Sequence, residues 1–252
     1  MKEHNLIQTA YWDSVAANNK VFGCDEMPYP AKREMERFFE FSGFKGGENI
    51  LEIGCGTGRY TLALLRMGCR VCATDISSES ISVLKKSAEA RGLDNNLSLE
   101  VDTFEDSGRC SRFTGKFDYV LFVAVIHHLD PAKKEDIIAN AVKSLKAGGK
   151  IIALEPNPFN PLYYLLYFWR WCARIKGKNR WATEKGFLRT STFSLKKLFH
   201  KSGLKNIKVC RYAWLPSVLG NSAPFILPVN DILNKIPVVR EMSAFTWMSA
   251  EK

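Results

Sequence analysis

The sequence predicts an α/β fold in which helices cover both faces of a mostly parallel, doubly wound sheet. Between residues 49 and 155, short apolar segments alternate with amphipathic helical patterns. A glycine-rich turn, Gly54–Gly58, also joins the first apolar segment to the first helical one. Strands that alternate with helices form parallel sheets, because each helix returns the chain to the same edge.

The core elements follow in order. We expect strands at Asn49–Ile53, Arg70–Thr74, Leu97–Val101, Tyr119–Val123 and Lys150–Glu155. The helical patterns between them are Tyr60–Met67, Ser78–Arg91 and Lys133–Leu145. Gly92 ends the second of these helices, and Ala147-Gly148-Gly149 breaks the chain before the fifth strand.

The flanking regions extend this core. Residues 1–45 look mainly helical, while residues 156–192 look irregular. We expect a helix at Ser194–Ser202, a strand near Asn206–Tyr212 and a last strand at Ala244–Ala250. A proline-rich stretch, residues 216–237, precedes that last strand.

Composition excludes several classes of protein. The 252 residues contain no apolar stretch of membrane-spanning length, and the N-terminal segment lacks the apolar core of a signal peptide. Seven cysteines without such a signal favour free thiols and a cytoplasmic location. Cys69 and Cys72 form one CxxC, but no second Cys/His pair stands at zinc-site spacing. We therefore expect packed or surface thiols there and no metal.

The glycine turn indicates a nucleoside site. A phosphate-binding P-loop would need a Lys-Ser/Thr pair where Arg59-Tyr60 stands, and a dinucleotide fold would need glycine at Arg59. Asp75 ends the second strand, 21 residues after Gly54, where a carboxylate can accept both hydroxyls of a ribose. Asp102 ends the third strand, within reach of an adenine amine.

Five motifs occur in order between Asn49 and Asn157. They read EIGCGTG, TDIS, VDTFED, FDYVLFVAVIHHL and LKAGGKIIALEPN. In this order and spacing they resemble the class I S-adenosylmethionine-dependent methyltransferases, above all the small-molecule branch that includes quinone-biosynthesis enzymes. The resemblance implies S-adenosylmethionine as cofactor, S-adenosylhomocysteine as product, and a Rossmann-like sheet of seven strands whose last strand is antiparallel.

The resemblance also implies cofactor contacts. They are Gly54, Cys55 and Gly56 against the methionine part, Asp75 at the ribose, Ile76 beside the adenine, Asp102 and Thr103 at the adenine edge, and Val123 through its backbone carbonyl. Phe122 and Val123 replace the small polar residues usual in the family. A backbone contact survives that change, whereas a side-chain contact would not.

Three residues are candidates for a general base, which helps when the methyl acceptor is a hydroxyl. His127 and His128 follow the fourth strand, beside the expected cofactor. Adjacent side chains diverge, so one should face the acceptor; the resemblance favours His128, and a purely structural histidine pair is the alternative. Glu155, after the fifth strand, is the second candidate base, and its alternative role is to bond loop amides.

The expected acceptor is a small molecule. Methyltransferases of base amines usually carry an Asn/Asp-Pro-Pro-aromatic tetrad after the fourth strand, where this chain has VAVIHH. Oxygen is favoured over nitrogen or carbon, on a lipid, quinone or glycan-linked compound. One alternative is a non-catalytic S-adenosylmethionine-binding regulatory or assembly protein, for which Phe122 and Val123 are the warning sign. An RNA methyltransferase is the weaker alternative.

The net charge of +10 lies in one segment. Between Pro161 and Arg211 the chain has thirteen Lys/Arg and one acid, Glu184. The same segment opens with an apolar and aromatic run, Leu162–Trp169, that is too short to span a bilayer. Residues 161–180 therefore suit peripheral contact with an anionic inner membrane surface, with a cap packed over the sheet as the alternative.

These observations predict a single methyltransferase domain. Residues 46–155 form the cofactor-binding core, and residues 193–252 complete the sheet. Residues 1–45, as an N-terminal helical cap, and residues 156–192, as a cap or lid insertion, should close over the site.

Overall fold

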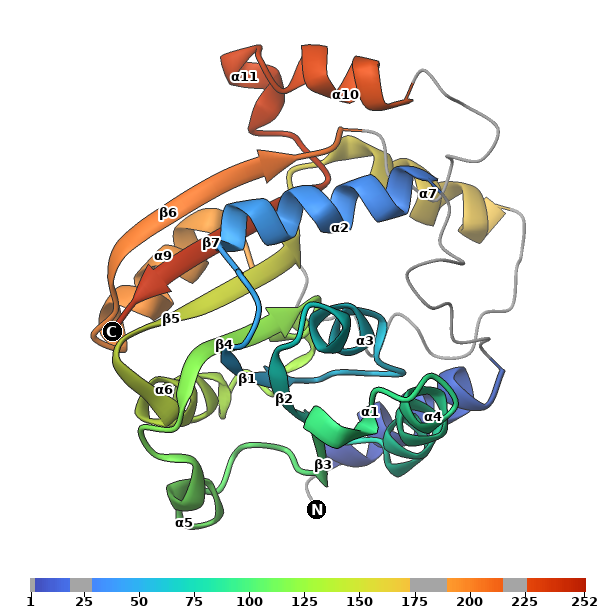
Figure 1. The fold of residues 1–252 in the computed structure, drawn as a ribbon. Coiled ribbons are helices and arrows are strands. Elements are labelled where there is room, and N and C mark those ends of the chain that lie inside the picture. The colour runs from blue at the N-terminus through green and yellow to red at the C-terminus, as the bar shows by residue number, and fades with distance from the viewer. Residues whose placement is uncertain (1–2, 19–28, 173–189, 215–225) are drawn as a thin grey trace.

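The computed structural model describes residues 3–18, 29–172, 190–214 and 226–252. Their centre is a seven-stranded sheet with the order β3-β2-β1-β4-β5-β7-β6 (Figure 1). The first five strands are parallel, and β7 runs antiparallel to both of its neighbours, β5 and β6. The strands are β1 (Asn49–Ile53), β2 (Arg70–Asp75), β3 (Leu97–Val101), β4 (Phe117–Val123), β5 (Leu145–Pro156), β6 (Lys205–Tyr212) and β7 (Phe245–Glu251). The predicted fold class is confirmed.

Helices cover both faces of this sheet because its strand residues alternate between two apolar cores. Leu51 and Ile53 of β1 belong to the core that also holds side chains of three helices: α5 (Ser107–Cys110), α6 (Lys134–Ser144) and α9 (Thr192–Lys201). Ile50 belongs to the opposite core. Its helices are α2 (Tyr29–Ser42), α3 (Arg59–Arg66) and α4 (Ser78–Glu89).

The structure differs from the sequence prediction in three places. β5 begins at Leu145 and runs through Gly148-Gly149, where a break was expected, because its start pairs with β4 across a register shift between Phe117 and Tyr119. The segment expected to be irregular contains α7 (Pro161–Cys172). The proline-rich stretch, for which no element was named, contains α10 (Ile226–Leu233), and α11 (Pro237–Arg240) begins at its last residue.

Helix-start signals explain α7 and α11. Pro161 opens α7, where its missing N–H costs nothing, and the Asn160 side chain accepts a hydrogen bond of 2.9 Å from the Leu162 amide. Pro237 opens α11 in the same way. The rest of both segments, residues 173–189 and 215–225, lies outside the described residues.

The N-terminal helix α1 (Glu3–Asn18) packs against α4 and reaches the carboxyl edge of the parallel strands (Figure 1). Two hydrogen bonds fix it to loops at that edge. Asn5 Nδ2 donates to Glu105 Oε1 at 2.7 Å, and Ser77 Oγ donates to Asp13 Oδ1 at 2.5 Å. α1 thus closes one side of the site described below.

Candidate active site

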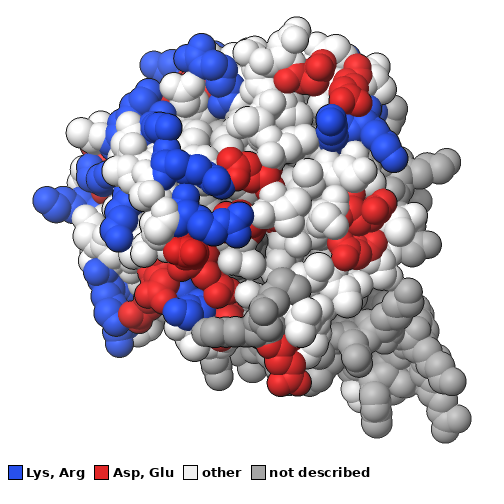
Figure 2. Space-filling model, turned by 90° about the horizontal axis from the view of Figure 1, so that it is seen from below, with Lys and Arg blue, Asp and Glu red and all other residues white. Residues whose placement is uncertain are grey.

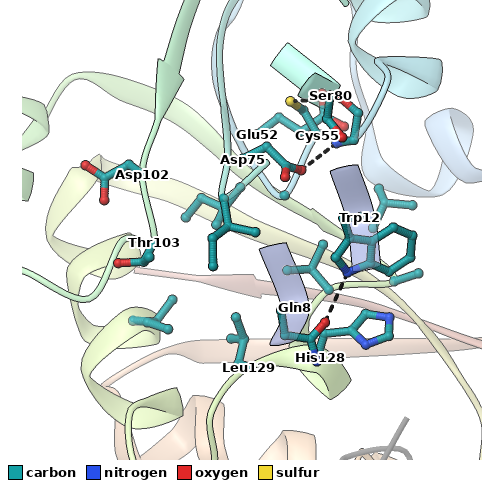
Figure 3. Close-up of a pocket in the computed structure, with 18 of the residues that line it drawn as sticks. Gln8, Trp12, Glu52, Cys55, Asp75, Ser80, Asp102, Thr103, His128 and Leu129 are labelled. Carbon is teal, nitrogen blue, oxygen red and sulfur yellow. Dashed lines mark hydrogen bonds between the residues drawn. The ribbon is translucent and has the colours of Figure 1, made fainter. Parts of the chain in front are cut away.

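A cavity of about 280 Å³ lies where the loops after β1, β2, β3 and β4 meet α1. All eight predicted cofactor positions line it: Gly54, Cys55, Gly56, Asp75, Ile76, Asp102, Thr103 and Val123. His128 also lines it, whereas His127 and Glu155 are not among the described residues that do. Figure 3 shows Asp102 and Thr103 on one side of the cavity and Trp12 and His128 on the other. The fold thus joins residues from five separate parts of the sequence.

The glycine turn brings the backbone to the cavity. Gly54 has a φ of +75°, and a Cβ placed on it would lie 2.4 Å from Val125 Cγ2. The turn after β4 therefore packs directly on the glycine turn. Gly56 has a φ of +52°, and a Cβ there would meet no atom within 4 Å among the described residues. Bare backbone therefore faces open space, which lets a ligand approach closely.

Asp75 is held at the centre of the site. Its Oδ2 accepts a hydrogen bond of 2.8 Å from the Gly56 amide (Figure 3). Its Oδ1 accepts one of 2.9 Å from the Ser77 amide. Burial raises the pKa of this carboxyl group. Each carboxylate oxygen can accept a second hydrogen bond, so Asp75 can still bind two hydroxyls of a ribose.

Asp102 has an oxygen without a hydrogen-bond donor. Oδ1 accepts a hydrogen bond of 2.7 Å from the Phe104 amide, while Oδ2 is buried and no described residue donates to it. The Arg109 and Arg112 guanidinium groups lie 3.3 and 3.8 Å from Oδ2 as ion-pair partners. A buried oxygen of this kind can accept a further hydrogen bond, and an adenine amine is a donor of the right kind. The site therefore fits a nucleoside cofactor.

Glu52 is a third buried carboxyl group at the cavity, and the sequence analysis did not select it. It accepts a hydrogen bond of 2.5 Å from Thr61 Oγ1. Burial, with a smaller effect of the Asp75 charge, raises its pKa to about 8. In the sequence, only its position two residues before Gly54 indicates that Glu52 lies at this site.

Glu155 and His127 organise the turn after β4. Glu155 is fully buried, and its Oε1 accepts hydrogen bonds from the Val125 amide at 2.9 Å and the Ile126 amide at 2.7 Å. Its Oε2 contacts the His127 amide at 3.3 Å and His127 Nδ1 at 2.7 Å. This geometry corresponds to the amide-bonding alternative considered for Glu155.

His128 faces the cavity beside α1. Its ring packs edge-on against Trp12 with 5.2 Å between ring centroids, and its backbone carbonyl lies 2.8 Å from His4 Nε2. The Trp12 indole donates a hydrogen bond of 3.1 Å to Gln8 Oε1 (Figure 3). Sequence analysis missed Gln8 and Trp12, because a helical pattern does not tell which distant loop its side chains will meet.

Comparison with known proteins agrees with this geometry. Residues 50–149, which include the glycine turn, Asp75, Asp102 and His128, match a family described as "Methyltransferase domain". Residues 50–149 form a domain of the class I S-adenosylmethionine-dependent methyltransferases. S-adenosylmethionine is therefore its methyl donor and S-adenosylhomocysteine its product.

Three proteins place this methyltransferase among its relatives. A ubiquinone biosynthesis O-methyltransferase of Xanthomonas oryzae is 29% identical over 112 residues, which are 44% of this chain and 44% of that enzyme. The match thus spans less than half the length of the curated relative. A crystal structure of an S-adenosylmethionine-dependent methyltransferase from Archaeoglobus fulgidus has a TM-score of 0.62 at 18% identity, covering 88% of this chain and 93% of that one. Geranyl diphosphate C-methyltransferase from Streptomyces coelicolor has a TM-score of 0.63 at 15% identity, covering 99% and 98%. Both structures share the fold.

Proposed function

We propose that this methyltransferase transfers a methyl group from S-adenosylmethionine to a hydroxyl oxygen of a small molecule, most favourably a lipid, quinone or glycan-linked compound. The observation that carries the proposal is that one cavity joins Asp75 and Asp102, which suit a nucleoside, to His128, which suits an acceptor. The Xanthomonas relative, by its name, is an O-methyltransferase of quinone synthesis.

Different side chains bind the cofactor, exclude water and accept the proton. When bound, S-adenosylmethionine supplies a sulfonium methyl that is already activated towards nucleophiles. Asp75 and Asp102 hold the nucleoside, and Trp12 and Gln8 of α1 help to exclude water from the cavity. The His128 ring accepts the proton of the acceptor hydroxyl, a role that typically accelerates a reaction by ~10²–10⁴-fold.

Calorimetric titration with S-adenosylmethionine, S-adenosylhomocysteine and NAD tests the cofactor assignment. We expect the first two to bind and NAD not to bind. Asp75→Ala should weaken binding by about 1–3 kcal/mol through loss of charge-assisted hydrogen bonds. Asp102→Asn should weaken binding too, while Asp106→Asn, a matched change at an exposed helix cap, should not. Binding of NAD alone would overturn the assignment.

The acceptor requires a second assay. The protein is incubated with methyl-labelled cofactor and, separately, with prenylated hydroxyquinols, a lipid extract, glycolipids and transfer RNA. We expect label in an O-methyl product of one of the first three. Label in RNA would favour the nucleic-acid alternative. Cofactor binding without transfer to any compound would favour a non-catalytic role. The apolar Phe122 and Val123 of β4 are the feature of the chain that favours this alternative.

A further inference from the structure

The helix α7 exposes a row of large apolar side chains. Phe159, just before the helix, is 61% exposed, and on the helix Tyr164, Leu165 and Phe168 are 48%, 61% and 60% exposed. Residues three and four positions apart share one face of a helix. Tyr164, Leu165 and Phe168 therefore form one continuous apolar surface, and such a surface marks an interaction site. Among the described residues, no helix is long and apolar enough to cross a bilayer.

A second exposed apolar set belongs to α10, α11 and the turn between them. Ile232, Ile236 and Val238 are 60%, 44% and 76% exposed. Lys235, between the first two, is exposed as well. Figure 1 shows α7, α10 and α11 toward the same end of the molecule.

Two buried asparagines tie these sets together. Asn157 Nδ2 donates hydrogen bonds of 2.8 Å to the carbonyls of Glu241 and Ser243, and Asn160 Nδ2 donates one of 2.8 Å to the carbonyl of Met242. Both asparagines precede α7, and all three carbonyls follow α11. The start of α7 is thus fixed to the end of α11. We call α7, α10 and α11, with Phe159, the platform.

The platform carries exposed basic side chains, those of Lys235 and Arg240. In the sequence, seven Lys/Arg and one Glu also occur between Arg170 and Arg189. The basic side chains of α9 do not belong to this group, because Figure 1 places α9 at the other end of the sheet from α7. Figure 2 shows a further gathering of Lys and Arg towards one side of the face seen from below. Basic residues are therefore not confined to the platform, and its exposed apolar side chains distinguish it.

We propose that the platform docks on the surface of an anionic lipid bilayer. Exposed Phe, Leu and Ile side chains can enter the boundary between headgroups and acyl chains, while neighbouring Lys and Arg attract anionic headgroups. The aromatic contribution does not depend on salt, whereas each basic residue near the surface contributes an attraction that salt screens. The proposal is independent of the methyl acceptor.

Co-sedimentation with vesicles tests the platform. The full chain is mixed with phosphatidylcholine vesicles, with or without phosphatidylglycerol, at low and high salt. We expect binding to the anionic vesicles that weakens but persists at high salt. Leu165→Ser with Phe168→Ser should lower the partition coefficient at least about tenfold at both salt concentrations, because two large apolar contacts are lost. Ile236→Ser with Val238→Ser should lower it as well.

Phe193→Ser is the matched control, because Phe193 is 78% exposed but lies on α9, outside the platform. It should leave binding unchanged, and thermal unfolding should show that all variants are folded. Absence of binding to anionic vesicles at low salt, or equal losses for Phe193→Ser and the platform variants, would overturn the proposal. A dimer in light scattering that Leu165→Ser with Phe168→Ser dissociates would also overturn it, and would assign this face to a second copy of the chain.

Discussion

Glu155 Oε2 and His127 Nδ1 lie 2.7 Å apart, and the same carboxylate receives the amides of the turn that carries His128. The turn begins at Ala124, whose φ of +55° is uncommon for a residue other than glycine. Tertiary contacts must therefore hold this backbone, and the Glu155 carboxylate supplies several of them. Glu155 acts on the site through the position of the turn.

We expect Glu155→Ala to lower the free energy of unfolding by about 3 kcal/mol or more, since each buried N–H left without an acceptor costs ~1–3 kcal/mol. Glu155→Gln should cost less, because one side-chain oxygen remains to accept the Val125 and Ile126 amides. Chemical denaturation measures both. Asp118→Asn is the control, since Asp118 also accepts a backbone amide, that of Asn49, but does not line the cavity. If Glu155→Ala were no more costly than this control, the turn would not depend on Glu155.

His128→Ala should lower turnover by about 10²-fold or more while changing cofactor affinity little, because a base acts on the acceptor. The measurements are the rate with the acceptor identified above and its pH profile, beside a calorimetric titration with S-adenosylhomocysteine. His200→Ala, at an exposed position of α9, is the control. An unchanged rate and pH profile would make His128 structural.

Cofactor affinity should depend on pH through Glu52. Because burial and the nearby Asp75 charge raise the pKa of Glu52 to about 8, this carboxyl group is mostly protonated at neutral pH. The positive charge of S-adenosylmethionine favours the ionised form, so binding below pH 8 should release a proton. Affinity should rise with pH and level off above about 8. Titrations in buffers with different ionisation enthalpies measure the proton release.

Glu52→Gln should abolish this proton release; its persistence in the variant would assign the proton to another group. The raised pKa of Glu52 also affects the free energy of unfolding of the protein without cofactor. Between the ordinary value of 4.5 and about 8, the folded chain binds more protons at Glu52 than the unfolded chain does. The Glu52 contribution to the free energy of unfolding should therefore be fully present below pH 4.5 and should decrease as pH rises to about 8.

Gly54→Ala should destabilise the protein and weaken cofactor binding. The added methyl would lie 2.4 Å from Val125 Cγ2, and the residue would keep a φ of +75°. Gly115→Ala separates the two effects, because Gly115 has a φ of +67° but no atom within 4 Å of its Cβ position. We expect Gly115→Ala to cost about 1 kcal/mol from backbone strain alone and Gly54→Ala to cost more. Chemical denaturation measures the free energy of unfolding of both variants. If the two substitutions lowered it equally, the turn after β4 would move freely away from Gly54.

The sequence analysis located the core because the signals there are local. β1 and β3 have the predicted bounds, since apolar runs ended by glycine or polar residues define them. The eight cofactor positions line one cavity because motif spacing fixes where each strand ends. The contacts of α1 could not be predicted in the same way: His4 meets the carbonyl of His128, 124 positions away, and no local pattern encodes such a pairing. α11 was missed because a proline in a proline-rich stretch, Pro237, opens this helix.

The place of β7 in the sheet has a consequence for how the chain folds. Ile151 of β5 pairs with Val120, 31 positions earlier, and with Ala250, 99 positions later. Contacts between residues far apart in sequence form slowly, because a long loop must close before they contribute. We therefore expect β1 to β5 to assemble first and to present β5 as a temporary open edge. The pair of β6 and β7 then closes that edge, so substitutions in the β7 core, such as Trp247→Leu, should accelerate unfolding more than they slow folding.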